Sequence, residues 1–112
     1  MTSDTSSETT DDIDVRDDPD RGRFTALVDG SVAGFVTYRQ QGHAITLLHT
    51  EVDPAYEGQG VGSRLVQGVL TQLRDRGADV LPHCSFVREY LQRHEEFVSL
   101  VPESERSRFD LA

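Results

Sequence analysis

The sequence contains no lysine, a single cysteine and no long apolar run, and each of these absences excludes a class of protein. Cys84 stands alone and cannot form an internal disulfide, so nothing favours the secreted, disulfide-stabilised class. No apolar stretch approaches the roughly 20 residues that cross a bilayer, and the acidic N-terminus is unlike a signal peptide. We therefore expect a cytoplasmic protein without a membrane partner.

Charge is unevenly distributed along the chain. The formal net charge is −9, and residues 1–20 hold eight acidic residues against one arginine, whereas the rest of the chain has twelve acids and ten arginines. An acidic chain is poorly suited to the phosphates of nucleic acids and better suited to a cationic partner. Residues 1–20 contain too few apolar side chains to offset their ordering entropy, so we predict that they form a disordered acidic tail.

The remaining pattern predicts one domain of the α+β class over residues 23–101. The predicted elements are strands over 24–28, 32–39 and 44–52, a helix with its apolar stripe over 65–73, a strand over 79–81, and a helix from an N-cap at Ser85 to about Glu95. The fourth strand follows a helical crossover, so it should lie parallel to the third and complete a mixed βββ-α-β-α sheet fold. Residues 102–112 are predicted to be a frayed C-terminal tail.

A glycine-rich loop joins the third strand to the first helix. Gly58, Gly60 and Gly62 lack side chains that would keep a phosphate away from the backbone, and a helix start adds unpaired N–H groups and about half a positive charge. Such a loop can also be a plain turn. A P-loop is excluded because it requires a lysine, and a dinucleotide fingerprint is excluded because three antiparallel strands come first. The segment therefore predicts another kind of anion site.

The residues of this loop resemble the motif of a known family. Val52 to Gly62 (VDPAYEGQGVG), followed by Leu65, is similar to the acetyl-CoA motif of GCN5-related N-acetyltransferases, Arg/Gln-x-x-Gly-x-Gly/Ala. The runs HTEV (49–52), EGQG (57–60), CSFV (84–87) and RH (93–94) more narrowly resemble the family's small, single-domain YjdJ-type branch. The resemblance covers residues 23–101. The first motif position, usually Arg or Gln, is Glu57 here, and a carboxylate does not favour phosphate binding.

The resemblance implies a site for acetyl-CoA as co-substrate. The pyrophosphate would bind backbone amides at the helix start, and the pantetheine would lie where the third strand and the strand near Val80 splay apart. Val52 would pair its main chain with the cofactor. The residues expected to bind the cofactor are Val52, Gly58, Gln59, Gly60, Val61, Gly62, Ser63 and Arg93.

Three residues are candidates for the chemistry, because a base must accept the proton of an attacking amine. His49 and Glu51 are two apart on one strand and should project from the same face, roughly 7 Å apart. His49 could equally be a hydrogen-bonded core histidine, and Glu51 a solvated residue at a strand end. Cys84, at a helix start, could protonate the departing CoA thiolate or accept the acetyl group, or it could be a small buried hydrophobic residue.

The sequence thus predicts an N-acetyltransferase that moves acetyl from acetyl-CoA to a primary amine. Two alternatives stay open at this point. One is a CoA-binding regulatory module without turnover, since the chain is short for the family. The other is an interaction protein whose acidic tail docks a basic partner.

Overall fold

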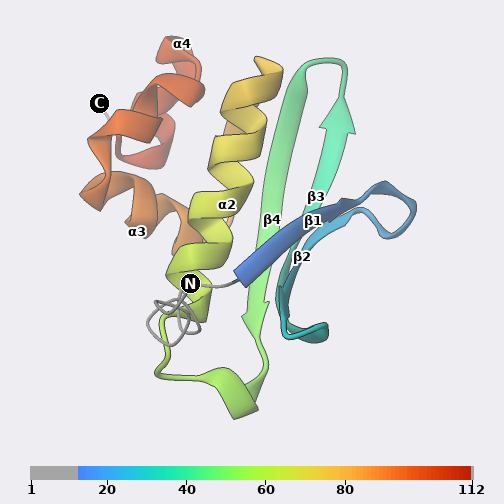
Figure 1. The fold of residues 1–112 in the computed structure, drawn as a ribbon. Coiled ribbons are helices and arrows are strands. Elements are labelled where there is room, and N and C mark those ends of the chain that lie inside the picture. The colour runs from blue at the N-terminus through green and yellow to red at the C-terminus, as the bar shows by residue number, and fades with distance from the viewer. Residues whose placement is uncertain (1–12, 112) are drawn as a thin grey trace, which may run out of the picture.

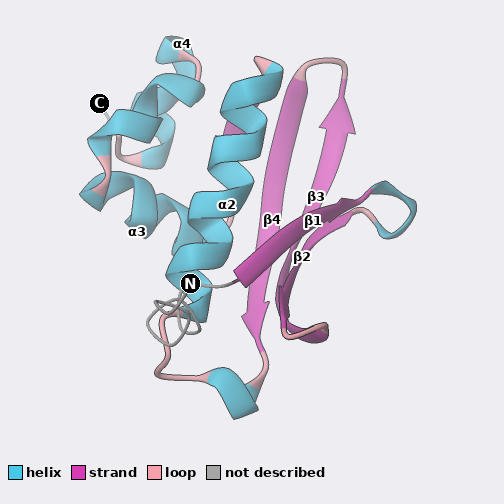
Figure 2. Ribbon diagram, viewed as in Figure 1, coloured by secondary structure: helices cyan, strands magenta, loops and turns pink. Residues whose placement is uncertain are grey.

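A computed structural model describes residues 13–111 as one five-stranded sheet covered by helices (Figure 1). The strands are β1 (Ile13–Asp18), β2 (Arg23–Val28), β3 (Ser31–Gln41), β4 (Ala44–Val52) and β5 (Asp79–Pro82), and the α-helices are α2 (Val61–Arg76), α3 (Ser85–Arg93) and α4 (Glu103–Arg106). The 3-10 turns are η1 (Pro19–Arg21), η2 (Pro54–Tyr56), η3 (Glu95–Leu100) and η4 (Ser107–Phe109) (Figure 2).

The strands lie in the order β1-β2-β3-β4-β5. The first four are antiparallel to their neighbours, and β5 runs parallel to β4 after the α2 crossover. The predicted mixed sheet and the parallel final strand are therefore confirmed. None of the helices within residues 13–111 is long and apolar enough to cross a membrane.

The prediction of a disordered tail is wrong for residues 13–20, which form β1 and most of η1. β1 pairs with β2 along its whole length, and Val15 fits against Gly68 of α2, where an added Cβ would lie 2.6 Å from Val15 Cγ2. Gln72 Nε2 donates a hydrogen bond of 2.7 Å to Val15 O. The first part of the predicted tail, residues 1–12, lies outside the described residues.

Asp17 holds the C-terminal end of β1 in place through two side-chain contacts. Its carboxylate accepts a hydrogen bond of 2.6 Å from the Tyr38 hydroxyl and forms a 2.5 Å ion pair with Arg76 of α2. Burial, reinforced by the Asp17 carboxylate, raises the pKa of Tyr38 to about 12. β1 is thus held by both α2 and β3, through contacts that lie far away in the sequence.

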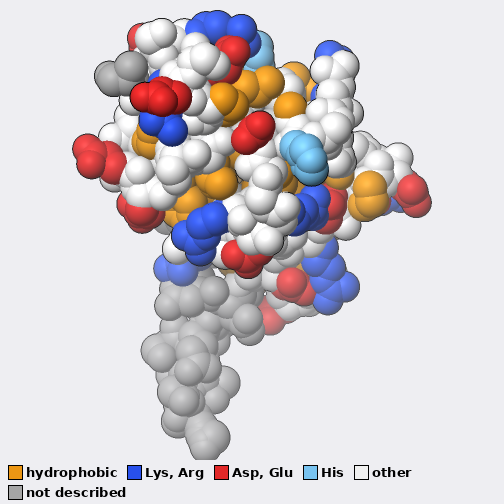
Figure 3. All heavy atoms as spheres, turned by 90° about the horizontal axis from the view of Figure 1, so that it is seen from above, with side chains coloured by type: hydrophobic (Ala, Val, Ile, Leu, Met, Phe, Trp, Pro, Cys, Tyr) orange, Lys and Arg blue, Asp and Glu red, His pale blue; other side chains and the backbone are white. Residues whose placement is uncertain are grey.

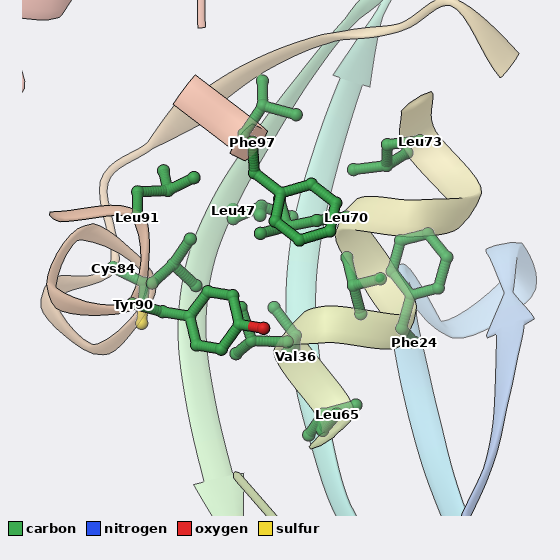
Figure 4. Packing of buried hydrophobic residues seen from close by; sticks show 14 of the residues in the cluster. Phe24, Val36, Leu47, Leu65, Leu70, Leu73, Cys84, Tyr90, Leu91 and Phe97 are labelled. Carbon is green, nitrogen blue, oxygen red and sulfur yellow. The ribbon is translucent and has the colours of Figure 1, made fainter. Parts of the chain in front are cut away.

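One face of the sheet carries the core. The buried strand residues alternate with more exposed ones and meet the apolar stripe of α2 and the inner side of α3 (Figure 4). The fully buried side chains include Phe24, Ala26, Val36, Ile45, Leu47, Val80, Leu65, Leu70, Leu73 and Leu91. In Figure 1 the described helices lie on this one side of the sheet. Residues 13–111 therefore leave the opposite face, called the outer face below, without a helix.

The C-terminal segment is folded rather than frayed. Phe109 is 3% exposed and meets the His83 ring edge-on, with ring centres 5.2 Å apart. Arg106 Nε donates to Val101 O at 2.9 Å. The helix predicted to reach Glu95 ends at Arg93, and its N-cap position is occupied by Cys84, since Ser85 is already the first helical residue.

Candidate functional site

The strand β4 extends beyond the end of its neighbour β5. All four residues of β5 pair with β4, from Ala44 with Asp79 to Leu47 with Pro82, and the bond from Cys84 N–H to Leu47 O, 3.0 Å long, follows the last pair. β4 then continues to Val52, and its residues 48–52 have no strand on that side among the described residues. This unpaired edge, called the β4–β5 opening below, is where the family resemblance implies a splay.

The backbone of Val52 faces this opening. The next residue, Asp53, donates its N–H to Ala33 O at 2.8 Å, on the side of β3. Because successive peptide groups of a strand point to opposite edges, the N–H and C=O of Val52 point away from β3. A ligand in the opening therefore meets one free donor and one free acceptor at this residue.

The loop after β4 leads directly to the start of α2. Asp53 caps η2 by accepting a hydrogen bond of 2.9 Å from the Ala55 N–H. Gly60, the N-cap of α2, has φ 79°, provides no side-chain cap and has open space where a Cβ would lie. The N–H groups of 61–63 have no partner within the helix, and together they carry part of the positive helix dipole. At Gly60 no side chain stands in the way of an anionic group that approaches them.

Gly62 has a different role from the one predicted. A Cβ at this position would lie 2.8 Å from Cζ of Phe86 and 3.5 Å from Cγ2 of Val52. The space next to Gly62 that was expected to admit a phosphate is therefore filled by the Phe86 ring, which comes from α3. Phe86 is 39% exposed. Phe86 was not singled out from the sequence, and its contact with Gly62 joins the start of α2 to the start of α3.

A shallow furrow runs between the first turns of α2 and the solvent-exposed side of α3. The furrow contains two adjoining hollows, and Ser63 and Tyr90 line both of them. Arg93 also lines the first hollow, and His94 also lines the second. His94 stacks on Tyr90 with ring centres 3.8 Å apart, and its Nδ1–H donates to Tyr90 O at 2.8 Å. Arg93, predicted to reach the cofactor, thus borders the same furrow as Ser63.

His49 and Glu51 lie together on the outer face. The His49 Nε2 is 3.2 Å from Glu51 Oε2, and the two side chains are 58% and 62% exposed. His49 is therefore not a core histidine. A carboxylate can only accept a hydrogen bond, so Nε2 carries the proton and Nδ1 is the basic nitrogen of the neutral ring.

Cys84 lies on the core side of the sheet, unlike His49 and Glu51. It is 7% exposed, and its Sγ is 3.2 Å from Thr50 Oγ1. Thr50 was not predicted to belong to the site. The structure therefore places Cys84 and the His49–Glu51 pair on opposite faces of the sheet and does not bring the three candidate catalytic residues together.

A pocket of about 400 Å³ opens beside the end of β4. Sequence patterns did not indicate it, because its walls come from two strands and a turn that are apolar for ordinary structural reasons. Its lining residues are Val32, Gly34, Phe35, Glu51, Val52, Asp53 and Pro54. Among residues 13–111 no three His, Cys, Asp or Glu side chains gather to hold a metal ion.

Comparison with known proteins now identifies the family. The family described as GCN5-related N-acetyl-transferase matches residues 23–100. No curated sequence matches the chain. The narrower YjdJ-type branch stays a prediction.

Three solved structures are similar to parts of the chain. Ard1 from Thermoplasma volcanium is 28% identical over 49% of this chain and 38% of its own, with a TM-score of 0.43. Nourseothricin acetyltransferase is 35% identical over 52% of this chain and 36% of its own, with a TM-score of 0.42. The ribosomal-protein-S18-alanine N-acetyltransferase from Escherichia coli is 22% identical over 70% of this chain and 48% of its own, with a TM-score of 0.50.

The match to the last of these structures shows a common fold. The chain spans less than half the length of each of the three proteins. Because the family match covers most of the chain, including β2 to α3, the family is established. The chain belongs to the GCN5-related N-acetyltransferases.

Proposed function

We propose that this chain transfers the acetyl group of acetyl-CoA to a primary amine. Members of the family use acetyl-CoA as co-substrate. The observation that carries the proposal is the free backbone edge of β4 at Val52, next to the uncapped start of α2. The first feature suits the amides of a pantetheine arm, and the second suits a pyrophosphate.

The residues at this end of the molecule fit such a ligand. The amides of Gly60 to Ser63 would hold the pyrophosphate, helped by the open space at Gly60, and Arg93 in the furrow would add positive charge. The Gln59 N–H, also predicted to take part, already donates to Tyr56 O at 3.3 Å. Glu57 precedes these amides, and its carboxylate does not contribute to pyrophosphate binding. Acetyl-CoA supplies the activated acyl group, and the chain supplies orientation and proton transfer.

His49 is the proposed base. An alkyl ammonium has a pKa of roughly 10, so an amine must lose a proton to become a nucleophile. Nδ1 of His49 can accept that proton directly or through one water, while the Glu51 carboxylate holds Nε2–H and fixes the tautomer. The exposure of both side chains leaves room for an acceptor on the outer face.

Cys84 is the proposed acid. Its thiol lies on the core side of the β4–β5 opening, against the hydroxyl of Thr50, and it can donate a proton to the departing CoA thiolate. This role is separate from that of His49, because the two side chains lie on different faces of the sheet. Replacing each in turn therefore tests two independent contributions.

The test is calorimetric titration with CoA followed by measurement of CoA release from acetyl-CoA with a panel of amines. We expect CoA to bind with a Kd of about 1–100 μM, which is roughly −8 to −5 kcal/mol, and release to depend on the amine. His49→Ala should lower kcat by about 10²-fold or more with CoA affinity unchanged, and Cys84→Ala should lower it by a smaller factor. Glu51→Gln should retain more activity than Glu51→Ala, because an amide oxygen still accepts from Nε2–H.

Two outcomes would change the conclusion. Absence of CoA binding at millimolar concentration removes both the enzyme and the CoA-binding module. Tight CoA binding without release across the amine panel leaves the non-catalytic module, the second candidate.

A further inference from the structure

The pocket on the outer face has a chemical character of its own. Five of its seven lining residues are apolar or glycine: Val32, Gly34, Phe35, Val52 and Pro54. The two polar ones, Glu51 and Asp53, are both acidic. One oxygen of each carboxylate is already engaged, because Asp53 Oδ1 accepts from the Ala55 N–H and Glu51 Oε2 accepts from His49 Nε2–H. The pocket therefore offers an apolar cavity whose anionic contacts, one free oxygen each of Glu51 and Asp53, both come from the end of β4 and the residue after it.

The walls of the pocket are fixed by neighbouring contacts. Phe35 stands opposite Glu51 in the β3–β4 ladder, and its ring centre is 6.5 Å from that of His49. The guanidinium of Arg23 lies over the Phe35 ring at 4.7 Å and does not line the pocket. No arginine is among the described residues that line the cavity, so the cavity keeps its negative and apolar character.

Val52 connects the pocket to the proposed cofactor site. Val52 lines the pocket, while its side chain approaches the start of α2 on the core side, with Cγ2 3.5 Å from the Cβ position of Gly62. Its backbone faces the β4–β5 opening. A molecule in the pocket with its amine toward Glu51 and His49 would therefore stand next to the residue proposed to orient the acyl group.

Val32 forms another wall of the pocket. It is 50% exposed, which is unusual for a large aliphatic residue on a sheet that buries its other face. No helix among residues 13–111 covers it. An apolar group entering the pocket would remove this side chain from water, which favours binding in proportion to the apolar area buried.

We propose that the acceptor is a small primary monoamine carried on an aryl or branched alkyl group, with the apolar group in this pocket and the ammonium at Glu51. The proposal rests on the proposed function and adds the class of acceptor. A polyamine or aminosugar would place a second cation or hydroxyl groups against the apolar lining, because the pocket's two carboxylates, Glu51 and Asp53, stand two positions apart at the end of β4. Figure 3 shows the end of the molecule away from this pocket, where acidic and basic side chains are interspersed around apolar ones.

The experiment compares phenethylamine with ethanolamine and putrescine, at saturating acetyl-CoA, by CoA release. We expect kcat/KM for phenethylamine to exceed both others by at least about tenfold, because the pocket contributes only for an apolar group. Val32→Asn should reduce that advantage by about tenfold while leaving ethanolamine within about twofold. Val32→Asp should favour putrescine. Ile13→Asn, a β-branched residue on β1 outside the pocket, is the matched control and should leave the order of the amines unchanged.

Binding provides a readout that does not depend on turnover. Phenethylamine titrated into the CoA-bound protein should shift the methyl resonances of Val32, and Val32→Asn should weaken this binding. A preference for putrescine, equal rates for all three amines, or an order that Val32→Asn does not alter would each overturn the proposal. Failure of the protein to bind CoA would instead overturn the proposed function, so the two failures are distinguishable.

Discussion

Replacement of Gly68 by alanine tests how β1 is attached to the domain. Gly68 lies in the middle of α2, where glycine costs roughly 1 kcal/mol relative to alanine, so helix propensity alone predicts that Gly68→Ala stabilises the protein. The structure predicts the opposite sign. The new Cβ would lie 2.6 Å from Cγ2 and 2.9 Å from Cβ of Val15, and neither atom is the free end of a flexible side chain. Either β1 or α2 must move.

The size of the effect follows from these contacts. Overpacking of this kind costs about 1–3 kcal/mol, and displacement of β1 also weakens the hydrogen bond from Gln72 to Val15 O, which contributes about 1 kcal/mol. After subtraction of the propensity gain of about 1 kcal/mol, we expect Gly68→Ala to lower the free energy of unfolding by about 1–3 kcal/mol.

Urea unfolding followed by circular dichroism measures this change. Asp75→Ala, an exposed change on the same helix, is the control and should show the propensity gain without the clash. In a Val15→Ala background the penalty of Gly68→Ala should shrink, because the closest contact is gone. A Gly68→Ala protein that is about 1 kcal/mol more stable than the parent would refute the packing of β1 against α2.

Three further outcomes are expected. Gly62→Ala should turn the Phe86 ring outward and weaken CoA binding several-fold, as measured by calorimetry. The same change in a Phe86→Ala background should have a smaller effect on CoA affinity. An effect of equal size in both backgrounds would contradict the contact between Gly62 and Phe86. Because the folded pKa of Tyr38 is raised to about 12 from 10.0, its stabilising contribution is complete below pH 10 and is lost as the pH rises toward 12. Urea unfolding between those pH values should therefore show a steeper loss of stability in the parent than in Tyr38→Phe. Phe109→Ala should lower the free energy of unfolding by about 3 kcal/mol, since a 3% exposed ring is removed, and a change below 0.5 kcal/mol would mean that the C-terminal segment does not pack as described.

The elements that could be predicted were those encoded locally. The helix α2 was found from its apolar stripe and its stop at Gly77, and the meander from its turn residues. β1 was missed because its two apolar residues stand among acids, and what holds it lies elsewhere: Gln72 is 57 positions away from Val15. Phe109 was missed for the same reason, because its partner ring at His83 comes from another part of the chain.

The site shows a second limit of sequence patterns. Strict alternation along β4 would place His49 and Glu51 on the same face as buried Leu47. The β3–β4 register shifts between the pairs Thr37 with His49 and Tyr38 with Leu47, which leaves Leu48 as an extra residue. This bulge turns the following side chains to the outer face, and it brings Thr50 to the core side against Cys84. The sequence therefore predicted that His49 and Glu51 share a face, but it did not predict which face of the sheet that is.

The central claim is that open backbone amides at the start of α2 bind the pyrophosphate of CoA, and calorimetry on two matched glycine variants tests it most directly. Gly60 and Gly42 both have positive φ and open space where a Cβ would lie, but Gly42 is in the β3–β4 turn, away from α2. Gly60→Leu should weaken CoA binding by at least about tenfold, roughly 1.4 kcal/mol, while Gly42→Leu should leave the affinity at the parent value. Equal CoA affinities for Gly60→Leu and the parent protein would contradict the account.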